Sequence, residues 1–155
     1  MSSTTMTPPI PIVLVGIHAD IGRPIAERLR PDWDVVRQIQ TLEAAEQDLP
    51  HLLRGRAPPA PATNDVGSGA FDGRPVRAVI FGRAFAQSQA EALYGRFGAD
   101  ADADAPVAWV ACDNAKRPVG GDPPPDAGEI MLPVFRAILE DWKAEDAAES
   151  RLILY

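Results

Sequence analysis

The sequence is short of several residue types, and each shortage excludes a class of protein or site. One cysteine, Cys112, stands in 155 residues, so an internal disulfide and a cysteine-rich zinc or iron–sulfur site are both excluded. The longest apolar run near the N-terminus, residues 10–17, is far shorter than the roughly 20 residues that cross a bilayer. Residues 1–9 have no basic start and no long apolar run, so no secretory signal is expected.

Positive charge is also scarce. Lys and Arg total 15 against 22 Asp and Glu, and the formal net charge is −7. Such a chain repels nucleic-acid phosphates and anionic lipid headgroups, so neither a nucleic acid nor a membrane is expected as a partner. His18 and His51 are the only histidines, and no metal site is expected. These exclusions favour a cytoplasmic protein whose partner is a small polar molecule or another protein.

The chain contains enough residues for one ordinary globular domain. Hydrophobic residues make up 46% of it, a usual share, whereas proline, at 16 residues, is about twice as frequent as normal. Pro and Gly gather in residues 55–75, which we expect to form a mobile surface loop with Val66 and Phe71 as its docking residues. Residues 1–9 are expected to be disordered, and residues 10–155 to form a single domain.

Apolar runs alternate with amphipathic segments along the chain. The runs predict strands at residues 11–16, 33–38, 76–82 and 106–111, and the amphipathic segments predict helices at 21–30, 42–53, 84–97 and 129–149. This alternation predicts an α/β fold, a small doubly wound parallel sheet of four strands with helices on both faces. The expected strand order is 2-1-3-4, with right-handed crossovers.

Local signals add detail to these elements. Thr41 is expected to cap the second helix, and Pro24 is expected in the first turn of the first helix, where a missing N–H costs little. The last helix is expected to bury a stripe of residues at i+4 spacing: Ile130, Val134, Ile138 and Trp142. The apolar residues 151–155 (RLILY) have two interpretations, docking on the sheet edge or forming a homodimer together with the last helix.

The segment that joins the first strand to the first helix reads VGIHADIG over residues 15–22. It resembles the cofactor loop of short-chain dehydrogenases, T-G-x-x-x-G-I-G, with matches at Gly16, Ile21 and Gly22. The resemblance implies a Rossmann-like fold in which Gly16 and Gly22 contact a nicotinamide cofactor. Arg37, near the end of the second strand, would then hold a 2′-phosphate, which favours NADP over NAD.

The same segment departs from that family where phosphate would sit. Asp20 replaces the central glycine, and its carboxylate would compete with a pyrophosphate for the helix N-terminus. The simpler interpretation makes Asp20 the N-cap of the first helix. The family's Tyr-x-x-x-Lys motif is also missing, because neither Tyr94 nor Tyr155 has a lysine four residues later. A complete short-chain dehydrogenase is therefore excluded, and no cofactor is expected beyond a weak case for NADP.

The whole chain is also similar to a group of short ascomycete proteins with a Rossmann-like fold. The likeness lies in a G-x-H-x-D-I-G-x-P opening, residues 16–24, and in the proline-rich middle of the chain. It implies the same fold and no particular activity.

Polar residues follow the strands that meet at the centre of the expected sheet. In the order 2-1-3-4 the switch point lies between the first and third strands, and ligands of α/β proteins bind at such points. The candidate catalytic residues there are His18, Asp20, Arg83 and Asp113. Cys112 also follows a strand. A phosphatase loop, Cys-x5-Arg, fails because Arg117 is one residue too early, and a buried, inert cysteine is the simpler interpretation.

Three functions remain open from the sequence. The first is a binding or accessory module that holds a small polar ligand or a protein partner at the carboxyl edge of the sheet. The second is a non-redox enzyme, an isomerase, lyase or cyclase, in which His18 transfers a proton, Asp20 or Asp113 orients it and Arg83 holds an anion. The third is a degenerate NADP-binding protein.

Overall fold

The computed structural model describes residues 9–71, 73–98, 106–117, 123–124, 126–145 and 150–155. The residues 1–8, expected to be disordered, lie outside this part of the chain. The strands are β1 (Ile10–Val15), β2 (Trp33–Ile39), β3 (Ala78–Phe81), β4 (Ala108–Ala111) and β5 (Arg151–Leu154). The helices are α1 (Ala19–Leu29), α2 (Leu42–Leu52), α3 (Gln87–Leu93), which continues into a π-helix at Tyr94–Gly98, and α4 (Ala127–Ala144).

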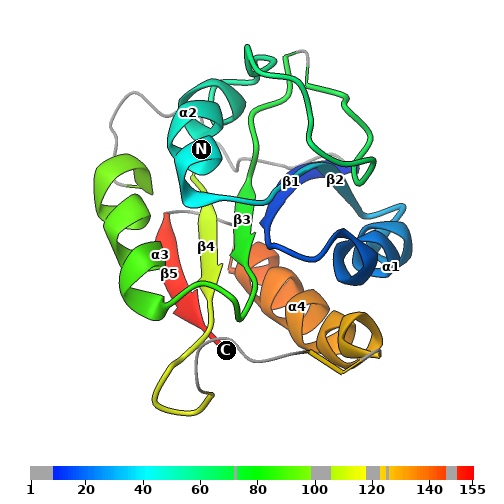
Figure 1. Ribbon diagram of the computed structural model, residues 1–155, viewed down its shortest axis with the longest axis vertical. Coiled ribbons are helices and arrows are strands. Elements are labelled where there is room, and N and C mark those ends of the chain that lie inside the picture. The colour runs from blue at the N-terminus through cyan, green and yellow to red at the C-terminus, as the bar shows by residue number, and fades with distance from the viewer. Residues whose placement is uncertain (1–8, 72, 99–105, 118–122, 125, 146–149) are drawn as a thin grey trace.

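The strands form one parallel sheet in the order β2-β1-β3-β4-β5, with helices on both faces (Figure 1). The predicted α/β fold and the order 2-1-3-4 are therefore confirmed, and a fifth strand is added. The apolar tail forms this strand: β5 pairs with β4, with Leu152 beside Trp109 and Ile153 beside Val110. The tail thus lies at the sheet edge.

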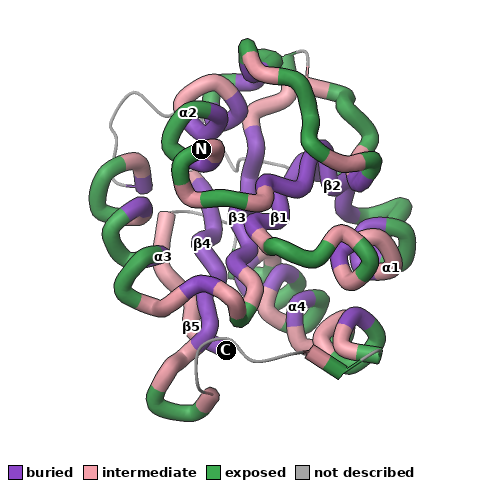
Figure 2. Tube along the Cα trace, in the orientation of Figure 1, coloured by how far each residue is buried: buried purple, intermediate pink, exposed green. Residues whose placement is uncertain are grey.

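The central strands are buried along their whole length, as Figure 2 shows. Because successive side chains of a strand point to opposite faces, each strand contributes to two separate cores. Ile12, Leu14 and Ile80 pack under α1 and α4, whereas Val13, Val79 and their neighbours pack under α2 and α3. Continuous apolar runs are what a strand covered on both faces requires, which is why the sequence identified these strands.

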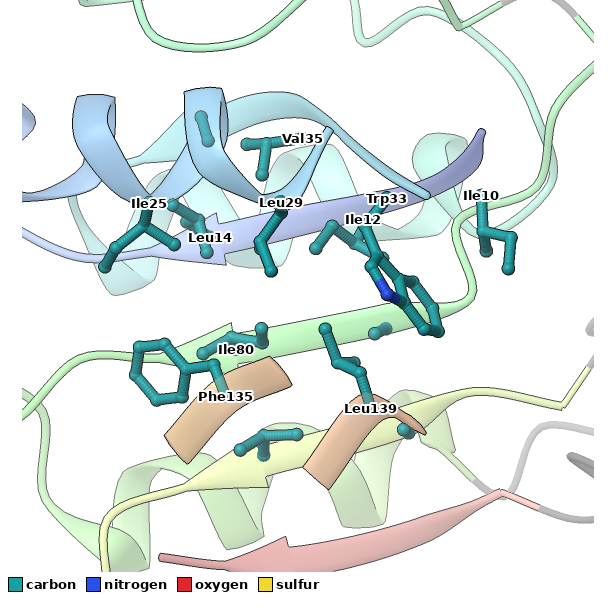
Figure 3. Close-up of a cluster of buried hydrophobic side chains, with 14 of the residues drawn as sticks. Ile10, Ile12, Leu14, Ile25, Leu29, Trp33, Val35, Ile80, Phe135 and Leu139 are labelled. Atoms are coloured by element: carbon teal, nitrogen blue, oxygen red, sulfur yellow. The ribbon is translucent and has the colours of Figure 1, made fainter. Parts of the chain in front are cut away.

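The core on the α1 and α4 face is drawn in Figure 3. Ile25 and Leu29 from α1 and Phe135 and Leu139 from α4 cover the side chains of β1 and β3. The two helices also contact each other closely at Gly128, where a Cβ atom would lie 2.7 Å from the carbonyl oxygen of Ile21. This face of the sheet is therefore covered by α1 and α4, which pack tightly against each other.

One expectation about the helices was wrong, and another holds only in part. The helix α1 begins at Ala19 with His18 as N-cap, so Pro24 lies in the second turn rather than the first. In the predicted stripe of α4, Trp142 is buried and Val134 and Ile138 pack against the core, but Ile130 is 53% exposed. A strict i+4 row drifts around a helix by about 40° per step, so the row begins outside the core at Ile130 and enters it toward Trp142.

Within the loop 55–75, residues 66–69 lie along the outer edge of β2. The N–H groups of Ser68 and Gly69 donate to the carbonyl oxygens of Val35 and Val36, at 2.9 and 3.0 Å. Val66 is buried against the core as expected. The loop thus pairs with an edge strand that would otherwise present free backbone groups.

Gly67 is the tightest point of this loop. Its φ is +107°, and a Cβ atom there would lie 2.6 Å from the carbonyl oxygen of Val36. Gly69 has φ +70° but nothing within 4 Å of the position of a Cβ atom. We expect Gly67→Ala to lower the free energy of unfolding by at least about 2 kcal/mol more than Gly69→Ala does, because only the first adds a backbone clash to the backbone strain.

Urea denaturation followed by circular dichroism measures both variants. Equal losses of stability in Gly67→Ala and Gly69→Ala would contradict the close packing of this loop on β2.

Candidate ligand-binding site

A cavity of about 230 Å³ opens at the carboxyl ends of β1 and β3. Its walls come from the loops after these strands and from the first turns of α1 and α4. Most of the lining is apolar, with Leu14, Ile25, Ile80, Met131 and Phe135 among its residues. The polar side chains in the lining are His18, Gln38, Arg83 and Tyr155.

The position of the cavity follows from the strand order. The connection after β1 leads to one edge of the sheet and the connection after β3 to the other, so the two loops separate at this point. The strand ends themselves stay close: the N–H of Gly82 donates to the carbonyl oxygen of Val15 at 2.8 Å. The cavity therefore lies at the predicted switch point.

Tyr155 lines the cavity from the end of β5. Its hydroxyl group donates to the carbonyl oxygen of Phe81 at 2.7 Å, and its ring packs edge-on against Phe135 with centroids 5.1 Å apart. Burial raises the pKa of the phenol, which the nearby Arg83 and Arg117 partly oppose. Sequence reasoning missed this residue because it follows a strand that was not identified with certainty.

Residues 15–22, which contain Gly16 and Gly22, are called the glycine loop below. Gln38 packs beneath this loop and is 2% exposed. Its Nε2 atom donates to the carbonyl oxygen of Gly16 at 2.9 Å, while its Oε1 atom is buried without a hydrogen-bond partner. A Cβ atom on Gly22 would lie 1.8 Å from Oε1. Gly22 is therefore explained by the packing of the Gln38 amide beneath α1.

His18 and Arg83 stand at the exposed rim of the cavity. The carbonyl oxygen of His18 accepts from the N–H groups of Ile21 and Gly22, which begin α1. Within the described part of the chain, neither the imidazole nor the guanidinium group makes a hydrogen bond or ion pair with another side chain. Both side chains are therefore available to a bound molecule.

The four predicted catalytic residues do not come together. His18 and Arg83 line the cavity, but Asp20 and Asp113 do not. Asp20 is the second residue of α1 and exposed, so its predicted role as N-cap was wrong, since His18 occupies that position. The carboxylate of Asp113 instead accepts from the N–H of Ala115 at 3.0 Å.

Arg37 is turned away from the cavity. It is 7% exposed, and its guanidinium donates to Asp48 at 3.1 Å and to the carbonyl oxygen of Ala60 at 3.1 Å. The ring of Phe71 lies 5.3 Å from the guanidinium carbon. Arg37 is therefore bound through Nη1 on the α2 side of the sheet, and its Nε atom is buried without a hydrogen-bond partner.

Cys112 is buried at the end of β4, as the simpler interpretation expected. Burial raises the pKa of its thiol, although Arg83 and Arg117 act in the opposite direction. Cys112 is not in the lining of the cavity. Among the described residues, no three His, Cys, Asp or Glu side chains gather as a metal site would need.

Comparison with known proteins identifies a curated relative from a fungus. No family model and no solved structure matches the chain. Kojic acid related protein 6 of Aspergillus oryzae is 30% identical over 131 residues, which are 83% of this chain and 76% of that protein. The chain belongs to the same family as this A. oryzae protein. Within the described residues of the present chain, no helix is long and apolar enough to cross a membrane.

The contact between Gly22 and Gln38 can be tested by a double-mutant cycle. Gly22→Ala is expected to lower the free energy of unfolding by about 1–3 kcal/mol, because the new methyl group has no room beside a buried amide. Gln38→Ala removes the obstructing atoms, so Gly22→Ala should cost much less in a Gln38→Ala background.

Urea denaturation of the two single variants and the double variant measures this coupling. If the cost of Gly22→Ala is the same in both backgrounds, Gln38 is not what excludes a side chain at position 22.

Proposed function

We propose that the protein is a non-redox binding module that holds one small metabolite in the cavity between β1 and β3. The observation that carries this proposal is the cavity itself, an apolar space with free polar groups at its rim, at the switch point of a parallel sheet. Largely preformed apolar pockets with a few convergent polar groups are the usual form of small-molecule sites.

The size of the cavity favours a small ligand over a dinucleotide. Sites for drug-sized ligands span about 300–1,000 Å³, and this cavity has about 230 Å³. The contacts around the glycine loop support the same choice. The space next to Gly22 is taken by the side-chain amide of Gln38, and the guanidinium of Arg37 donates a hydrogen bond to Asp48. The NADP-binding alternative therefore has less support than a small-molecule site.

The enzyme alternative also has less support. It requires an acid that orients His18, and among the described residues neither Asp20 nor Asp113 hydrogen-bonds to this histidine. An imidazole at an exposed rim, without an orienting partner, is a weaker arrangement for proton transfer than for ligand contact.

The name of the A. oryzae relative links that protein to kojic acid. Kojic acid is a small single-ring molecule of a size that suits the cavity, so it is the first probe for the proposed site.

A substitution that fills the cavity tests the proposal. Ala84 lines the cavity, and Ala115 lies exposed at the same edge of the sheet outside the lining. We expect kojic acid to raise the melting temperature of the native protein and of Ala115→Phe, since a ligand that binds only the folded state stabilises it. In Ala84→Phe the added ring occupies the binding space, so the shift should disappear.

Differential scanning fluorimetry at several kojic acid concentrations, up to millimolar, measures these shifts. Equal shifts in Ala84→Phe and Ala115→Phe would place binding elsewhere and contradict the proposal. The absence of a shift in the native protein would exclude kojic acid as its ligand.

A further inference from the structure

We infer that the ligand of this cavity is a small apolar molecule with one negative charge, a carboxylate, which Arg83 binds at the rim. The inference rests on the proposed function and adds the chemical class of the ligand. It is carried by two features that occur together, an apolar wall and a single cation without an acid partner.

The apolar wall of the cavity favours a ligand that is apolar over most of its surface. Side chains from two strands and two helices supply it: Leu14 of β1, Ile80 of β3, Ile21 and Ile25 of α1, and Met131 and Phe135 of α4. An apolar ligand body gains from leaving water against such a surface, whereas sugar or nucleotide hydroxyl groups would lose hydrogen bonds there. The wall therefore selects against strongly polar ligands, kojic acid with its two hydroxyl groups included. A thermal shift with kojic acid but no binding of an apolar carboxylate would support the proposed site and overturn this ligand class.

The charge at the rim sets the head of the ligand. Among the described residues that line the cavity, Arg83 is the only Lys, Arg, Asp or Glu. Some arginines elsewhere in the described chain pair with acids, as Arg23 does with Asp65 and Arg74 with Asp34. Others, such as Arg56 and Arg117, have no acid partner among the described residues either, and Arg83 differs from them in lining the cavity. Arg83 has no such partner among the described residues. A guanidinium with free donors binds a carboxylate through two parallel hydrogen bonds.

The backbone adds to the positive potential at this rim. The first turns of α1 and α4 both contribute to the lining, through Ile21 and Ala127, and a helix N-terminus carries a partial positive charge. Asp20 opposes this effect, but its side chain lies outside the lining. A single guanidinium, supported by these partial charges, matches the one negative charge of a carboxylate.

The test compares two probes of nearly the same shape, cyclohexanecarboxylate, which is charged, and cyclohexanecarboxamide, which is neutral. Isothermal titration calorimetry of the native protein should give an affinity for the carboxylate about tenfold or more above that for the amide. Arg83→Gln should weaken carboxylate binding to the level of the amide and leave amide binding unchanged. Arg83→Lys keeps the charge but cannot form the two parallel hydrogen bonds, so it should retain only part of the preference.

Arg56→Gln is the matched control, because it removes the same charge from an exposed loop position outside the lining. It should keep the full preference for the carboxylate. Circular dichroism checks that each variant is folded. If Arg83→Gln does not fold, an undiminished preference in Arg83→Lys would overturn the two-bond contact with Arg83.

The outcomes separate the inference from the proposed function. If the native protein binds both probes equally and Ala84→Phe abolishes binding, the site stands and the carboxylate class is wrong. A preference that survives Arg83→Gln overturns the role of Arg83. If neither probe binds and kojic acid gives no thermal shift, both the inference and the proposed function fail.

Discussion

The contact between α1 and α4 is the constraint on which the rest of the site depends. At Gly128 the two helices approach so closely that a Cβ atom would lie 2.7 Å from the Ile21 carbonyl oxygen and 3.0 Å from Cγ of Pro24. The helices can therefore roof one face of the sheet together, with Phe135 and Leu139 over β1 and β3 (Figure 3). The cavity is the space that remains between these two helices and the carboxyl ends of β1 and β3.

The two faces of the sheet have different roles because of this roof. On the α2 and α3 face the core is filled, and the buried pair of Arg37 and Asp48 ties β2 to α2 and to the loop 55–75. On the α1 and α4 face the buried amide of Gln38 packs beneath the glycine loop and forms part of the cavity wall. The cavity itself stays open. A loop that resembles a cofactor site is thus filled from within by the protein's own side chain.

The fold could be predicted from the sequence because buried parallel strands are continuous apolar runs and the helices between them are amphipathic. The strand β5 is only four residues long, so its pattern alone did not distinguish a strand from a dimer contact. The switch-point rule led to His18 and Arg83, which line the cavity, because it depends only on strand order. It could not say where side chains point, and Asp20, Asp113 and Arg37 lie outside the lining.

The residues that were missed share a different property. Gln38 and Tyr155 reach the cavity through tertiary contacts, to Gly16 and to Phe81 respectively, and are far from these partners in the sequence. A glutamine in the second strand carries no signal of its own. Only the packing of β2 beside β1, in which Gln38 lies opposite Leu14, brings its amide under the first helix.

The central claim is that a small molecule occupies the cavity between β1 and β3, and amide chemical shifts test it most directly. Kojic acid or cyclohexanecarboxylate would be titrated into ¹⁵N-labelled protein. The account predicts that the largest shift changes fall on the backbone amides of residues 16–18, 82–84 and 127–131, which surround the cavity. Largest changes in the loop 66–71 or in α3, with none around the cavity, would contradict it.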